Sequence, residues 1–234
     1  MNIFDYSIIS FFNQFAQRSV QFDQLVLLIS DNVLLKGGFI LALFCYAWFK
    51  EDSFKIVQRN REYILITILA SSVGIVGARL LVLSLPFRLR PLHNPEIALQ
   101  FPLKRDFLEG WSSFPSDHAI LFFTLATGLF FVSRILGSIA IAHAIFVISL
   151  PRIYLGLHYP TDILAGALIG IGVALLVNRR KISSRITKLP MRLLDKNPSL
   201  FYSCFFVVDF EIAEMFNSLR NIAKVIFSLL SSFT

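Results

Sequence analysis

Long apolar runs constrain this chain more than any other feature of its sequence. Five of them, at about residues 33–50, 62–85, 116–133, 136–155 and 160–178, approach the roughly 20 apolar residues that a helix needs to cross a membrane. Lipid offers backbone groups no hydrogen-bond partner, so each run must be helical. A mean hydropathy of +0.68 agrees with this reading. The sequence therefore predicts an all-α, polytopic transmembrane helical bundle.

The chain divides into three regions. The first, residues 1–31, holds two shorter apolar stretches interrupted by Asp5, Asp23 and Asp31, which predict interfacial helices or a partial span. Residues 32–180 form the transmembrane domain, so the bundle has five or six spans. Residues 181–234 form a basic and amphipathic tail, in which apolar residues recur at helical spacing beyond about residue 199. This pattern predicts a C-terminal amphipathic cytoplasmic helix.

Basic residues predict how the chain is oriented in the membrane. They gather between residues 50 and 61, at Arg134, and between residues 179 and 196, and the positive-inside rule makes these segments cytoplasmic. Residues 86–115 and 156–160 are then extracytoplasmic. The net charge of +7 is interleaved with the apolar runs rather than forming one basic face, so we expect no nucleic-acid partner.

Three polar clusters lie in or beside the two extracytoplasmic loops. They are PFRLRP with Arg88 and Arg90, FPSDHA with Ser116, Asp117 and His118, and PRIYLGLHYPTD with Arg152, His158 and Asp162. The last two also read as helix starts, where free N–H groups bind anions. Arginine forks match phosphate oxygens, and two histidines with a carboxylate can supply nucleophile, orienting group and general acid. The clusters therefore predict a phosphoryl-group pocket at the membrane surface.

These clusters resemble the three signatures of the type-2 phosphatidic acid phosphatase superfamily, KxxxxxxRP, PSGH and SRxxxxxHxxxD. Here RP is Arg90-Pro91, PSDH ends at His118, and the third pattern runs from Arg152 through His158 to Asp162. The FPSDH form is also similar to that of undecaprenyl-pyrophosphate phosphatases of the bacitracin-resistance type.

The resemblance implies a role for each of these residues. His158 attacks phosphorus to form a phosphohistidine, while Asp162 holds the other ring nitrogen and His118 protonates the leaving oxygen. The phosphate-binding residues that we expect are Arg90, Arg152, Ser116, Arg88 and Arg79.

The chain departs from the family pattern at three positions. Leu83 stands where the family has its lysine, and Arg79, one helical turn earlier, is the candidate replacement. Pro151 replaces a serine. Asp117 replaces a glycine, and we expect it to cap its helix or to position His118 rather than to bind substrate.

Other functions use the same residues. Asp117, His118, His158 and Asp162 could hold a hydrolytic metal, but nearby arginines would repel a cation, so we expect no metal and no other cofactor. A transporter or a non-catalytic lipid-phosphate binder would use the arginines alone. Turnover of a lipid phosphate separates these alternatives.

The hypothesis is an integral membrane lipid phosphatase that hydrolyses undecaprenyl diphosphate to the monophosphate. Phosphatidic acid, phosphatidylglycerol phosphate and lipid A are the alternative substrates, and the partners are the lipid substrate and membrane lipids, with no obligate protein. We expect a multi-pass protein of the bacterial inner membrane, with its site facing the periplasm or exterior.

Overall fold

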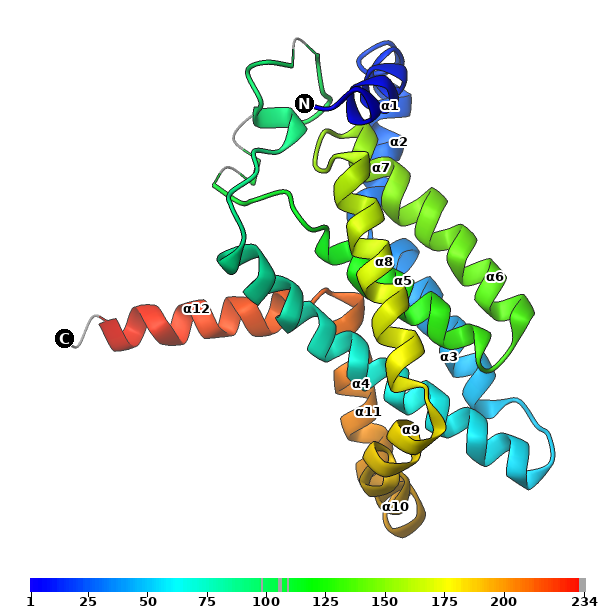
Figure 1. Ribbon diagram of the computed structural model, residues 1–234. Helices are drawn as coiled ribbons and strands as arrows, with labels where there is room; N and C mark the ends of the chain where they lie inside the picture. Colours follow the sequence, from blue (N-terminus) through cyan, green and yellow to red (C-terminus); the bar gives the residue numbers. More distant parts are fainter. Residues whose placement is uncertain (98, 105–106, 109, 232–234) are drawn as a thin grey trace.

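The computed structural model describes residues 1–97, 99–104, 107–108 and 110–231, and within that part every regular element is helical (Figure 1). This confirms the predicted all-α class. The α-helices are α1 (Ile3–Asn13), α2 (Val20–Asp31), α3 (Phe39–Phe49), α4 (Phe54–Ser84), α5 (Asp117–Phe130), α6 (Arg134–His143), α7 (Leu150–Tyr154), α8 (Pro160–Val177), α9 (Arg180–Ile186), α10 (Lys188–Lys196), α11 (Pro198–Ala213) and α12 (Asn217–Ser231). Two π-helical turns, η1 (Leu34–Gly38) and η3 (Ala144–Ser149), and the 3₁₀ turn η2 (Pro91–His93) complete the set.

The described part of the chain contains three helices that are long and apolar enough to cross a membrane. They are α4, the continuous helix Arg134–Tyr154 and α8. The pair Val20–Asp31 and Leu34–Phe49 makes a fourth if its two halves, bent by 61°, form one broken span. Apolar side chains on the outer faces of these helices are exposed, as expected beside lipid, among them Val73, Leu80, Ile135, Phe146, Leu164 and Leu168. The chain is thus a multi-pass membrane protein, and a count of five or six spans stays a prediction.

Helix α5 is the centre of the bundle. It packs against α4, α6 and α8, and its side chains from Ala119 to Leu129 are all buried. Its 14 residues rise only about 21 Å, less than the roughly 30 Å of a hydrocarbon core. Because protein surrounds it, α5 begins inside the bundle and does not have to reach both membrane surfaces.

Two glycines bring α8 unusually close to α5. A Cβ atom at Gly166 would lie 2.6 Å from the Ser116 carbonyl oxygen, and one at Gly170 would lie 2.5 Å from that of Ile120. Only glycine permits such an approach, as in other membrane helix pairs with small residues four apart. The contact fixes the start of α5 beside the start of α8, where two of the three polar clusters lie.

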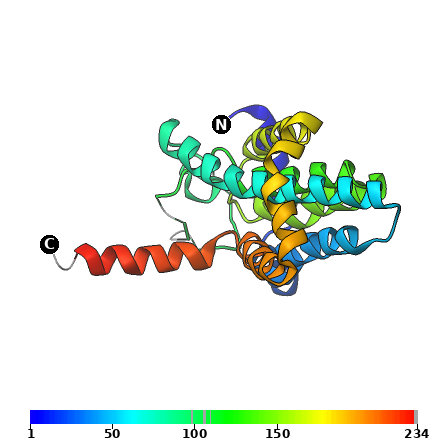
Figure 2. The ribbon, with the colours of Figure 1, turned by 90° about the horizontal axis from the view of Figure 1, so that it is seen from below.

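The C-terminal region turns back along the bundle. Helix α11 begins beside α10 and packs against α3, where Phe201 stacks on Trp48 with ring centroids 5.6 Å apart. Its other end reaches Gly37, where a Cβ atom would lie 2.3 Å from Cα of Ala213. Helix α12 then points sideways, away from the bundle (Figures 1 and 2). Residues 181–231 therefore do not remain together at the end of the bundle where α9 and α10 lie.

Candidate active site

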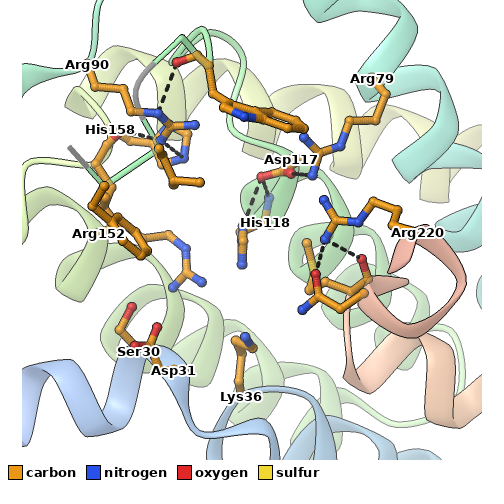
Figure 3. Close-up of a pocket in the computed structure, with 16 residues that line it drawn as sticks. Ser30, Asp31, Lys36, Arg79, Arg90, Asp117, His118, Arg152, His158 and Arg220 are labelled. Carbon is orange, nitrogen blue, oxygen red and sulfur yellow. Dashed lines mark hydrogen bonds and ion pairs between the residues drawn. The ribbon is translucent and has the colours of Figure 1, made fainter. Parts of the chain in front are cut away.

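A pocket of about 210 Å³ lies where the start of α5, the α7–α8 loop, the α2–α3 break and the start of α12 meet (Figure 3). Both predicted histidines, His118 and His158, line it. The other charged lining residues are five cations and two carboxylates, namely Lys36, Arg79, Arg90, Arg152 and Arg220 with Asp31 and Asp117. The pocket thus has a surplus of three positive charges, which favours a multiply charged anion.

His158 is held with one ring nitrogen facing the pocket. Its Nδ1 lies 2.8 Å from the Ser113 carbonyl oxygen, and its Nε2 lies 3.4 Å from Nη1 of Arg90. A carbonyl only accepts and a guanidinium only donates, so Nδ1 carries the proton and the lone pair lies on Nε2, where it accepts from Arg90. Burial lowers the pKa of His158, and the nearby Asp162 carboxylate opposes that shift. Burial therefore favours the neutral form of the ring.

Asp162 is fully buried, and its strongest contacts are with groups other than His158. Its Oδ2 accepts from the Tyr159 backbone N–H at 2.8 Å, which caps α8, and its Oδ1 pairs with Arg88 at 2.5 Å. The His158 Nδ1 is 3.7 Å away, beyond hydrogen-bond distance. The family resemblance implies that Asp162 holds that nitrogen, whereas the Ser113 carbonyl is the group within hydrogen-bond distance of it. Asp162 acts on His158 as a nearby charge.

In the described part of the chain, Arg88 is not one of the residues that line the pocket. Its guanidinium bridges Asp162, Asp5 and the Thr161 hydroxyl, at 2.5, 2.9 and 3.0 Å. Asp5 also accepts from the Thr161 backbone N–H at 2.9 Å. Arg88 therefore ties α1 to the start of α8 behind the site, which leaves its guanidinium occupied rather than available to a phosphate.

His118 is oriented by a chain of charged groups. Its Nδ1 lies 2.9 Å from Oδ1 of Asp117, whose Oδ2 pairs with Arg79 at 2.6 Å. Arg79 in turn lies over the ring of Trp111, 5.1 Å from the centroid. Asp117 thus contacts both His118 and Arg79, and the Nε2 of His118 is left for the pocket (Figure 3). Arg79 lines the pocket but is already neutralised by Asp117.

Arg90 and Arg152 are buried cations on the same side of the pocket as His158 (Figure 3). Arg90 donates to the carbonyls of Leu157 at 2.7 Å and Ser112 at 3.3 Å. Arg152 makes one hydrogen bond, from Nη1 to a carbonyl in its own helix, and its buried Nε has no partner in the described chain. Ser116 caps α5 by accepting from the Ala119 N–H at 3.4 Å, and it does not itself line the pocket.

The PAP2 superfamily matches residues 61–182, just over half of the 234-residue chain. All three polar clusters fall inside this range. The chain belongs to the PAP2 superfamily.

Individual relatives match parts of this chain. The bacitracin transport permease protein BcrC of Bacillus licheniformis is 44% identical over 66 residues, 28% of this chain and 32% of BcrC. The match thus spans about a third of that relative. The undecaprenyl-diphosphatase of Sulfolobus acidocaldarius is 28% identical over 151 residues, 63% of this chain and 70% of its own length. The crystal structure of Aquifex aeolicus LpxE has the same fold, with a TM-score of 0.50 and 24% identity over 75% of this chain and 98% of LpxE.

Six pocket residues lie outside the PAP2 match, the adjacent pair Ser30 and Asp31 at the end of α2 and four more, and sequence reasoning assigned none of them to the site. Lys36 comes from the α2–α3 break, and Met215, Asn217 and Arg220 come from the C-terminal region. The sequence did contain a signal for Lys36. A lysine within an apolar run is costly in lipid and therefore indicates a functional site by default. The sequence contained no such signal for Met215, Asn217 and Arg220, because they reach the pocket only through the return of α11.

The C-terminal contribution also changes the expected topology. The basic segments predict that residues 181–234 are cytoplasmic and that the site lies on the opposite face. These expectations conflict, because Arg220 and His158 line one pocket. The start of α12 therefore lies on the side of the bundle that carries the site.

Proposed function

We propose that this PAP2 membrane phosphatase removes the terminal phosphate of undecaprenyl diphosphate through a phosphohistidine on His158. The observation that carries this proposal is the neutral His158 ring, whose Nδ1 proton is held by the Ser113 carbonyl while Nε2 faces a pocket rich in cations. Such a ring needs no proton removed before it attacks phosphorus.

In the first step, Nε2 of His158 attacks the terminal phosphorus, and the bond from that phosphorus to the bridging oxygen breaks. His118 is protonated in the complex because the negative charge of the bound diphosphate offsets the burial that otherwise lowers its pKa to about 3. It gives its proton to the bridging oxygen, so the lipid monophosphate leaves without a full extra charge. Arg90 turns from Nε2 to the phosphoryl oxygens. With Arg152 it meets the charge that spreads over these oxygens in the transition state.

In the second step, water attacks the phosphorus of the phosphohistidine. Neutral His118 takes the proton of that water, the bond between phosphorus and Nε2 breaks, and inorganic phosphate leaves. Both histidines return to their starting states. The negative charge of Asp162, 3.7 Å from Nδ1, stabilises the phosphorylated ring while it carries positive charge.

Charge supports a diphosphate as substrate. A phosphate monoester carries about −1.5 to −2 charges at pH 7, and an ionised diphosphate monoester carries about one more. The surplus of three positive charges in the pocket matches the larger value. The similarity to the undecaprenyl-diphosphatase of Sulfolobus acidocaldarius supports the same substrate class.

The charged groups support a mechanism without a metal. Asp117 is paired with Arg79 and His118, and Asp162 with Arg88, so both carboxylates already have cationic partners. We place the site at the extracytoplasmic face of a bacterial inner membrane, on the basis of the basic segments that the positive-inside rule makes cytoplasmic.

A phosphate-release assay tests this function. Purified protein in mixed micelles should release inorganic phosphate from undecaprenyl diphosphate with a higher kcat/KM than from phosphatidic acid, phosphatidylglycerol phosphate or lipid A, and equally well with EDTA present. A tenfold preference for a diacyl phosphate or lipid A would refute the isoprenoid substrate. Inhibition by EDTA that zinc or magnesium reverses would refute the metal-free mechanism.

A further inference from the structure

Lys36 is a buried cation in the wall of the pocket. Its exposed fraction is 7%, and its amine makes no hydrogen bond or ion pair with any residue that the structure describes. Figure 3 shows the side chain reaching into the pocket from below, toward His118. Burying an unpaired ammonium group is costly, so this arrangement points to an anion that is bound there in the working protein.

The broken helix explains why Lys36 faces the pocket. The chain bends between α2 and α3, and Asn32 caps the new start by accepting from the Leu35 N–H at 3.0 Å. The π-helical turn η1, which contains Lys36, follows at once. Interrupted membrane helices commonly place such ends at binding sites, because the protein surrounds the irregular backbone there.

Arg220 lies near Lys36 because α11 packs against η1, the turn that contains Lys36. Gly37, next to Lys36, is in close contact with Ala213 at the end of α11, and the chain enters α12 directly afterwards. Arg220 donates from Nε to the Phe216 carbonyl and from Nη2 to the Met215 carbonyl, at 3.4 and 3.3 Å. Its Nη1 has no hydrogen bond with the residues described and remains for a ligand.

His118 divides the pocket into two cationic sides (Figure 3). Arg90 and Arg152 lie on one side, with the nucleophile His158. Lys36 and Arg220 approach His118 from the other side and from below. His118 is the proposed proton donor to the bridging oxygen, so the group beyond that oxygen lies toward Lys36 and Arg220.

We propose that Lys36 and Arg220 form a subsite for the second phosphate of a diphosphate substrate, the phosphate that stays on the lipid. This inference rests on the proposed phosphatase function and deepens it. The subsite places the bridging oxygen at His118 and favours diphosphates over monophosphates, whose single phosphate occupies the Arg90 and Arg152 side. Leu83, where the family pattern has its lysine, is 83% exposed and contributes no cation to the pocket.

Two substrates that differ by one phosphate test the subsite. Farnesyl diphosphate and farnesyl monophosphate share one tail, and kcat/KM for each is measured with wild type, Lys36→Met, Arg220→Gln and Lys36→Arg. Each neutral variant should lower the ratio of diphosphate to monophosphate kcat/KM by about tenfold, the loss of one charge-assisted hydrogen bond. Lys36→Arg should retain most of the ratio. Lys55→Met, on the exposed start of α4, is the matched control and should leave the ratio unchanged.

Inhibition gives an independent measurement on the same proteins. Methylenediphosphonate should inhibit Lys36→Met about tenfold less well than wild type, whereas inhibition by inorganic phosphate should change by less than about threefold. If Lys36→Met fails to fold, Arg220→Gln on the partly exposed helix carries both measurements. An unchanged ratio, or equal losses on both substrates, would overturn the subsite while leaving the phosphatase intact. Absence of phosphate release by wild type from any lipid phosphate would instead overturn the proposed function.

Discussion

Asp162→Asn isolates what a single negative charge contributes to the nucleophile. Asparagine has the same shape, its amide oxygen can still accept from the Tyr159 N–H, and Arg88 keeps its ion pair with Asp5 at 2.9 Å. The proton on His158 Nδ1 also stays in place, because the Ser113 carbonyl holds it at 2.8 Å. The substitution therefore removes the charge and its ion pair with Arg88, and leaves the tautomer unchanged.

The distance sets the size of the effect. Two unit charges about 4 Å apart interact by about 4 kcal/mol at an effective dielectric constant of about 20, and the Asp162 oxygen lies 3.7 Å from Nδ1. The positive charge on the ring is full only once Nε2 has bonded to phosphorus. We therefore expect kcat to fall by about 10²–10³ with little change in KM. This is less than the roughly 10⁴ loss found where a carboxylate also sets the histidine tautomer.

The pH profile gives the second measurement for Asp162→Asn. The nucleophile must be neutral, so kcat/KM falls as the pH drops through the pKa of His158. Burial already lowers this pKa, and Asp162 raises it in part. Removing Asp162's charge lowers it further, so the acidic limb should move to lower pH.

Both effects are measured by following the release of inorganic phosphate at a series of pH values. Asp195→Asn, on the exposed surface of α10, is the control. A loss of less than tenfold, or an acidic limb that moves to higher pH, would refute the reasoning.

Three further predictions follow from the packing and the site. His118→Ala should lower kcat by about 10²–10⁴ on the lipid diphosphate and by much less on p-nitrophenyl phosphate, whose leaving group needs no proton; equal losses would argue against a proton donor. Gly37→Val should lower stability by about 1–3 kcal/mol, seen as a lower Tm, because the new side chain meets Ala213 at 2.3 Å; an unchanged Tm would contradict that contact. In a cysteine-free background, single cysteines at Lys104 and Asn221 should be labelled from the same side of the membrane, and labelling of the two from opposite sides would disprove the shared-face topology.

Most of the site residues could be predicted from local spacing in the sequence. The fixed intervals from Arg152 to His158 and Asp162, and the PSDH segment before an apolar run, were enough to bring His118 and His158 to one face once the spans were counted. The structure places both in one pocket with Arg90 and Arg152. Such features can be recognised in the sequence because each depends only on a helix start and the residues next to it.

Long-range packing determined the rest. Ser113 holds His158 through a backbone carbonyl, which any residue type offers, so the sequence contains no signal for it. Arg88 looked like a phosphate ligand because it lies two residues from Arg90, but it points to Asp5 and Asp162 instead. Arg220 enters the pocket only through the return of α11. Side chains that meet across distant segments cannot be paired by spacing alone.

Trapping the phosphoenzyme tests the central claim most directly. Protein turning over undecaprenyl diphosphate labelled in its terminal phosphate is quenched in base, where phosphohistidine is stable and phosphoserine is not, and the labelled peptide is sequenced by mass spectrometry. The mechanism predicts phosphate on Nε2 of His158, and no labelled protein from His158→Ala. Label on another residue, or label that persists in His158→Ala, would contradict it.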